Sequence, residues 1–369
     1  MAFSGPFRRL ALGPGVGRHF ALALLVSLAG GALFHALGLP LPWMLGATFL
    51  ATVAALGGLP VAIPAGARSL MMTVLGVMLG SAFTPEVMES AALWLGSIAA
   101  MVVYAVLVSL VVYVLLRRLL GYDPITAYFA GTPGGLSEMT LIGGALGGDE
   151  RAIALTHSLR IVLIVFAIAL GFQWFGGYVP GAAGAGGWVP VAALGVGDVG
   201  VLLVCGVLGA LAGRTLRLPA GMLLGPMILS AAAHLAGLTA VPPPSVLVAA
   251  AQVVVGGAIG CRFVGTPPRL ILRTAAASLG VAGLMLAATL GFAAALAPLT
   301  GLPFAALVLA FAPGGLAEMA LIALALGIDT AFVSTHNVFR VLAIIVLAPL
   351  VFRIVRRRTD RARVPAADD

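Results

Sequence analysis

Long apolar segments follow one another along most of the chain, with short loops between them. They lie at 19–37, 41–58, 66–83, 90–116, 123–147 and 150–175, and again at 199–216, 220–237, 246–264, 272–296, 303–327 and 330–354. A helix needs roughly 17–25 apolar residues to cross the hydrocarbon core of a bilayer. The pattern therefore predicts an all-α polytopic membrane protein with roughly 10–12 hydrophobic segments.

The second six segments repeat the first six at an offset of about 180 residues. The strongest match pairs Pro133–Met139 with Pro313–Met319. Gly76 matches Gly256, and each is followed four residues later by a second glycine, a spacing typical of close helix packing. These matches indicate an internal duplication.

The duplication predicts five parts of the chain. A cytoplasmic N-terminal segment at 1–18 precedes a first membrane repeat at 19–180. A Gly-rich linker at 181–198 leads to the second membrane repeat at 199–355, and a basic cytoplasmic tail at 356–369 follows.

The fifth apolar segment of each repeat is interrupted by a Pro-Gly-Gly sequence. The residues at the two predicted tips are Pro133, Gly134, Gly135, Pro313, Gly314 and Gly315. Each half of the interrupted segment has about ten residues and reaches roughly 15 Å, half the thickness of the hydrocarbon core. Broken helices are tolerated at this depth where they are buried in protein or line a wet cavity. We therefore expect one re-entrant hairpin per repeat, with the two tips meeting near the midplane.

The arginines decide between two topologies. If all six segments of each repeat crossed the membrane, the loops with Arg214 and Arg273 would lie outside, against the positive-inside rule. If the fifth segment re-enters, each repeat has about five transmembrane helices, the second repeat is inverted, and the flanking arginines, Arg262 included, fall inside. We therefore expect two inverted repeats in a membrane, with both termini cytoplasmic. Arg18 precedes the first apolar run and no small-residue cleavage site follows, which predicts a retained first helix.

Composition excludes several classes of protein. Hydrophobic residues make up 62% of the chain and charged residues 9%, with a mean hydropathy of +1.17, whereas soluble domains carry about 25% charged residues. The net charge of +8 comes from arginines at segment ends, so no direct nucleic-acid binding is expected. Cys205 and Cys261 lie far apart and predict no disulfide, metal site or cofactor. The expected partners are the lipid bilayer, a small solute and H⁺ or Na⁺, and a homo-oligomer is left open.

Glu138 and Glu318 begin the second half-helix of each predicted hairpin. One interpretation is a cap that satisfies exposed backbone N–H groups at a helix N-terminus, where the dipole favours a carboxylate. The other is a proton or cation site, or a counter-ion to a buried arginine, because ionisable residues inside a membrane are costly and functional. Ser137 and Thr132 lie beside them and complete a candidate polar site.

Arg160 and Arg340 lie roughly nine to eleven residues inside the last helix of each repeat, a depth of about 14–16 Å. They either form structural ion pairs with the hairpin glutamates or bind an anionic solute bidentately. His157 and His336 share a helix face with these arginines, and each is either a packing residue or a proton relay. Asn337 is a further polar candidate.

Four motifs resemble the AbrB-duplication family of bacterial membrane proteins. They are Gly131–Met139, Ala312–Met319, Thr156–Arg160 and Thr335–Arg340. The resemblance covers nearly the whole chain. This family is named both as an ammonia monooxygenase and as a regulator of gene expression, and it is unrelated in fold to the soluble DNA-binding AbrB switch protein. Its helix-and-hairpin organisation is similar to that of secondary transporters with inverted repeats.

These observations favour a secondary transporter or permease for a small, anionic solute coupled to H⁺ or Na⁺. A membrane-embedded regulator of gene expression is the alternative that the family name implies. An enzyme of the ammonia-monooxygenase type ranks third, because the sequence shows neither a catalytic motif nor a metal-ligand cluster. We expect no catalytic residue, so the protein is not expected to be an enzyme.

Overall fold

The computed structural model describes residues 16–89, 91–176 and 188–361, without the side chains of 16, 268–273 and 353–361. Most of the predicted N-terminal segment at 1–18 lies outside the described residues. So do part of the predicted linker at 181–198 and the end of the predicted tail at 356–369.

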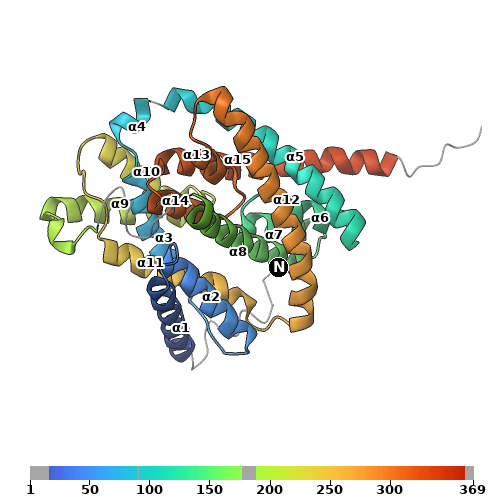
Figure 1. Cartoon of the computed structure of the whole chain (residues 1–369), viewed down its shortest axis with the longest axis horizontal. Coiled ribbons are helices and arrows are strands. Elements are labelled where there is room, and N and C mark those ends of the chain that lie inside the picture. Colours follow the sequence, from blue (N-terminus) through green and yellow to red (C-terminus); the bar gives the residue numbers. More distant parts are fainter. Residues whose placement is uncertain (1–15, 90, 177–187, 362–369) are drawn as a thin grey trace, which may run out of the picture. The chain divides into compact units, whose positions relative to one another are not determined.

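Helices form all of the regular secondary structure in the described ranges (Figure 1). The α-helices are α1 (Val16–Ala36), α2 (Pro42–Leu56), α3 (Ala65–Gly80), α4 (Pro85–Glu89), α5 (Trp94–Leu120), α6 (Pro124–Gly131), α7 (Leu136–Ala145), α8 (Glu150–Phe175), α9 (Val196–Thr215), α10 (Gly221–Leu235), α11 (Ser245–Gly260), α12 (Pro268–Thr300), α13 (Phe304–Phe311), α14 (Leu316–Ala325) and α15 (Thr330–Arg361). Short 3₁₀ turns are η2 (Ala91–Leu93), η3 (Val191–Ala193) and η4 (Cys261–Phe263). The helical fold class expected from the hydrophobic pattern is confirmed.

Seven of the described helices are long and apolar enough to cross a membrane. They are α1, α5, α8, α9, α11, α12 and α15, some of them trimmed or extended by a few residues. The predicted segments 41–58, 66–83 and 220–237 form shorter apolar helices: α2 and α10 have 15 residues each, and α3 has 16. At 1.5 Å per residue these three helices are about 22–24 Å long, less than a full hydrocarbon core.

The chain forms two compact units, and each unit takes helices from both halves of the sequence. Unit 1 comprises 1–92, 162–272 and 314–334. Unit 2 comprises 93–161, 273–313 and 335–369. Helices α8, α12 and α15 therefore contribute one end to each unit.

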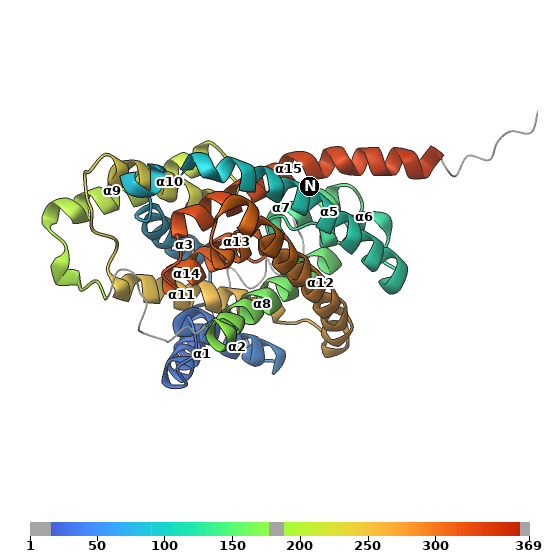
Figure 2. The ribbon, with the colours of Figure 1, turned by 45° about the horizontal axis from the view of Figure 1, so that its top comes forward.

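In unit 1, helices at matching positions of the two sequence repeats pack in the same way. α2 packs against α1 and α11, and the matching α10 packs against α9 and α3. Figures 1 and 2 both show α1 and α2 side by side. Close backbone approach explains the duplicated glycines: a Cβ at Gly76 would meet the carbonyl oxygen of Leu223, and one at Gly256 would meet that of Met44. The packing role predicted for these glycines is confirmed.

Left-handed backbone positions also repeat. Leu41 and Ala220, which precede α2 and α10, have φ values of 46° and 47°. Gly121 and Gly301, which precede the predicted hairpins, have φ values of 65° and 70°. Leucine and alanine adopt this conformation at a cost, so its presence at matched positions shows that the duplication extends to local backbone geometry.

Both predicted helix breaks are present. α6 and α13 have eight residues each, and α7 and α14 have ten each. Thr132–Gly135 separates α6 from α7, and Ala312–Gly315 separates α13 from α14. Proline lacks the N–H that would continue the helix and restricts the preceding residue to extended backbone, which explains why both first half-helices stop there.

Candidate functional site

Two buried arginines in unit 2 bind the carbonyl groups at the helix breaks. Arg160 Nη1 donates a hydrogen bond to the carbonyl oxygen of Thr132 at 3.1 Å. Arg340 Nη1 donates to the carbonyl oxygen of Ala312, and at 3.4 Å to that of Phe311. The side chains are 1% and 2% exposed, so both guanidinium groups are removed from solvent.

These contacts satisfy the C-terminal ends of α6 and α13. The last four carbonyl groups of a helix have no partner within it and carry a partial negative charge. A guanidinium group placed there supplies hydrogen-bond donors and a compensating positive charge. The two interpretations from sequence were an ion pair with a hairpin glutamate and a solute site. The observed hydrogen bonds add a third role, which is to hold the broken helices.

A second polar side chain repeats in the same way. His157 Nε2 lies 2.8 Å from the carbonyl oxygen of Phe129, and Asn337 Nδ2 donates to that of Leu309 at 3.5 Å. The structural counterpart of His157 is therefore Asn337. His336, the histidine that the sequence places beside Arg340, instead lies 2.8 Å from Ser97 Oγ.

Tyr104 on α5 lies among these groups and was missed by the sequence interpretation. Its hydroxyl oxygen is 2.8 Å from Thr289 Oγ1, and its side chain is fully buried. Tyr104 interacts electrostatically with Arg160 and Arg340, and the two arginines also interact with each other. Tyr104 is one of four hydroxyl-bearing residues in α5, together with Ser97, Ser109 and Tyr113, so no signal in the sequence singled it out.

The two hairpin glutamates fold back over the glycines that precede their helices. A Cβ added at Gly135 would collide with the Glu138 carboxylate, and one at Gly315 with the Glu318 carboxylate. Each glycine is the N-cap and each glutamate occupies the third helical position, in the first turn of its helix. Both glutamates are half-buried. Each carboxylate therefore lies at a helix N-terminus, where the helix dipole favours a negative charge.

Glu318 also has charged neighbours within unit 1. Arg262 in η4 interacts electrostatically with Glu318 and with Arg68. The residue that matches Arg262 in the first repeat is Ala82. The sequence interpretation had counted Arg262 only among the flanking arginines, so its interactions with Arg68 of the first repeat and Glu318 of the second were missed.

The remaining polar candidates lie at the first break. Thr132 Oγ1 donates back to the carbonyl oxygen of Tyr128 at 2.8 Å, within its own helix end, and Ser137 is exposed. Three further polar atoms at this end of unit 2 are buried without a hydrogen-bond partner in the described part of the chain: Thr156 Oγ1, His157 Nδ1 and Arg160 Nε. Orphan atoms gathered in one place indicate a site for water or a ligand.

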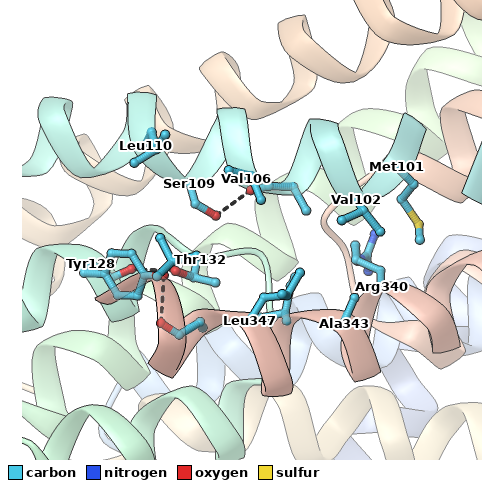
Figure 3. Close-up of a pocket in the computed structure, with 14 residues that line it drawn as sticks. Met101, Val102, Val106, Ser109, Leu110, Tyr128, Thr132, Arg340, Ala343 and Leu347 are labelled. Atoms are coloured by element: carbon cyan, nitrogen blue, oxygen red, sulfur yellow. Dashed lines mark hydrogen bonds between the residues drawn. The ribbon is translucent and has the colours of Figure 1, made fainter. Parts of the chain in front are cut away.

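A cavity of about 30 Å³ lies between α5, α6 and α15 (Figure 3). Arg340 lies at one end of it, and Tyr128 and Thr132 lie at the other. A space of this size is sufficient for water. Within the described ranges, no group of three or more His, Cys, Asp or Glu side chains is arranged to hold a metal ion.

Known proteins match this chain over most of its length. Residues 43–356 match the family described as "Transition state regulatory protein AbrB". The chain is 28% identical over 358 residues to "Uncharacterized protein YhjN" of Bacillus subtilis (strain 168), covering 89% of this chain and 91% of that protein. It is 26% identical over 335 residues to "Putative regulator AbrB" of Escherichia coli (strain K12), covering 90% and 94%. With apolar helices, a duplicated Pro-Gly-Gly helix break and a family match over most of its length, the chain belongs to the AbrB family.

Proposed function

We propose that this protein is a secondary transporter for a small anionic solute, coupled to H⁺ or Na⁺, and not an enzyme. In this proposal the chain spans a bacterial inner membrane with both termini cytoplasmic. Two inverted repeats each supply about five transmembrane helices and one re-entrant hairpin. The observation that carries the proposal is the pair of broken helices in which buried Arg160 and Arg340 bind the carbonyl groups at the breaks.

The balance of buried charge supports an anionic solute. The two guanidinium groups bring two positive charges close to each other. The C-termini of α6 and α13 supply about half a negative charge each, so about one positive charge is left over. An uncompensated buried charge is unfavourable, and a bound monovalent anion would neutralise it.

The repeated packing supports alternating access. In transporters built from repeats, one element moves against another around a site formed by broken helices. In unit 1, α2 of the first repeat packs against α11 of the second as α10 of the second packs against α3 of the first, so the two repeats form equivalent helix contacts. The small cavity of unit 2 is consistent with a site that opens only when helices move.

Uptake into proteoliposomes tests the proposal. The purified full-length protein should accumulate at least one of radiolabelled acetate, L-lactate, succinate and phosphate. The double variants Glu138→Gln with Arg160→Gln, and Glu318→Gln with Arg340→Gln, should fold but lose uptake. Arg18→Gln is the matched control, because Arg18 is exposed and far along the chain from both breaks.

Thermal unfolding in detergent separates loss of transport from loss of folding. If the arginines only hold the broken helices, the double variants should lose stability together with uptake, because the carbonyl groups at the breaks lose their donors. A folded double variant with wild-type uptake would overturn the site assignment. A wild-type protein that moves none of the four anions would count against this substrate class.

The second candidate is a membrane-embedded regulator of gene expression. It is favoured by the printed name of the Escherichia coli relative and by the description of the family. A deletion strain distinguishes the two candidates. A transporter predicts changed uptake of one solute within minutes of its addition, whereas a regulator predicts changed transcript levels with unchanged uptake in membrane vesicles.

A further inference from the structure

The tautomer of His157 is set by its hydrogen bond. Its Nε2 lies 2.8 Å from the carbonyl oxygen of Phe129. A carbonyl group only accepts hydrogen bonds, so Nε2 carries the proton and, in the neutral ring, Nδ1 is an acceptor. Nδ1 is fully buried and has no hydrogen-bond partner in the described residues. The imidazole therefore presents one unused proton-binding atom inside unit 2.

The second repeat shows that the structural role does not require a histidine. Asn337 donates to the carbonyl oxygen of Leu309 as His157 donates to that of Phe129. An amide N–H is therefore sufficient to bind the end of the broken helix. The property that distinguishes His157 from Asn337 is its ability to take up a proton.

The charged surroundings of His157 link proton uptake to an anion. Arg160, one turn further along α8, acts on His157 electrostatically. Arg340 on α15 and Tyr104 on α5 in turn act on Arg160. A proton on His157 would add a positive charge beside buried guanidinium groups, which is unfavourable unless an anion binds as well. The anion would also gain two hydrogen-bond donors. One is the new N–H of protonated His157 Nδ1, and the other is the N–H of Arg160 Nε, which has no hydrogen-bond partner in the described residues.

We propose that His157 binds one proton together with one monovalent anion, so that the coupling ion of this protein is H⁺. This inference rests on the proposed transport function. The lone pair of Nδ1 takes the proton, and the new N–H donates to an oxygen of the anion. On release, the proton and the anion leave together and the ring returns to its neutral form. Glu138 and Glu318 then serve as caps and are not needed for coupling.

Proteoliposomes that contain the pH-sensitive dye pyranine test the inference on the wild-type protein. With acetate and L-lactate as probes, anion influx should acidify the lumen with one proton per anion. Because a monoanion and a proton carry no net charge, a potential imposed with K⁺ and valinomycin should leave the rate unchanged. Uptake without proton movement, or uptake driven by the potential, would overturn the inference.

The second repeat indicates which substitution of His157 to test. His157→Asn copies the second repeat and His157→Gln keeps a donor toward Phe129, so at least one of them should fold. In the wild type, uptake should fall by up to tenfold per pH unit once His157 loses its proton. In either variant it should change less than twofold between pH 5.5 and 7.5, and luminal acidification should be lost.

His234→Asn is the control, because His234 is a buried histidine of unit 1 outside the candidate site. It should keep the pH profile of the wild type. If a folded His157 variant also keeps that profile and its proton flux, His157 is not the coupling group, and the transport function stands. If the wild-type protein moves no anion, the transport function fails and this inference fails with it.

Discussion

At the first helix break, a larger residue than glycine is opposed by a side chain and not by the backbone. Gly135 has φ −65° and ψ 136°, a conformation open to any residue. A Cβ at this position would nevertheless collide with the Glu138 carboxylate. Gly135→Ala should therefore displace Glu138 from the N-terminus of α7. Displacing the carboxylate weakens its interaction with the helix dipole, which is worth about 0.3–1 kcal/mol. We expect the free energy of unfolding to fall by about that amount.

A double-mutant cycle isolates this contact. In a Glu138→Ala background the carboxylate is absent, so Gly135→Ala should cost less than it does in the wild type. Unfolding would be followed by titration with a denaturing detergent at constant pH. Gly96→Ala on α5 is the control, because a Cβ there meets nothing within 4 Å and alanine is the better helix former. An equal cost of Gly135→Ala with and without Glu138 would refute the placement of the carboxylate.

Three further outcomes are expected. Reporter fusions at residues 121 and 149 should report the same side of the membrane, and opposite signals would exclude a re-entrant hairpin. Gly256→Val should destabilise the protein by more than about 2 kcal/mol in thermal or detergent unfolding, because its side chain would meet the backbone of Met44, and wild-type stability would contradict the α2–α11 crossing. Tyr104→Phe removes a hydroxyl bonded to a threonine, so we expect about 1 kcal/mol of destabilisation and slower uptake, and unchanged uptake would place Tyr104 outside the site.

Local chemistry is sufficient to predict the helices and their breaks. An apolar run of membrane length has few alternatives to a helix, because a backbone in lipid must satisfy its own hydrogen bonds. Proline at 133 and 313 removes a donor, so the sequence alone places both breaks correctly. Comparison of the two halves also reveals the duplication, since matched residues are visible without any knowledge of packing. The division into two compact units, each drawing on both halves, is not visible in this way, because it depends on contacts between distant segments.

The partners of the polar residues were decided by the tertiary structure. Spacing along a helix identifies which residues share its face, and it correctly put His157 beside Arg160. It carries no information on what faces them, and the partner of Arg160 is a carbonyl group 28 residues away. The repeat offset aligns His157 with Asn337, but only the structure shows that both side chains bind a carbonyl group at a matched helix end. Sequence thus determined where charge lies in this protein, and packing determined which backbone groups that charge stabilises, because buried polar atoms bind whatever donor or acceptor the fold brings within about 3 Å.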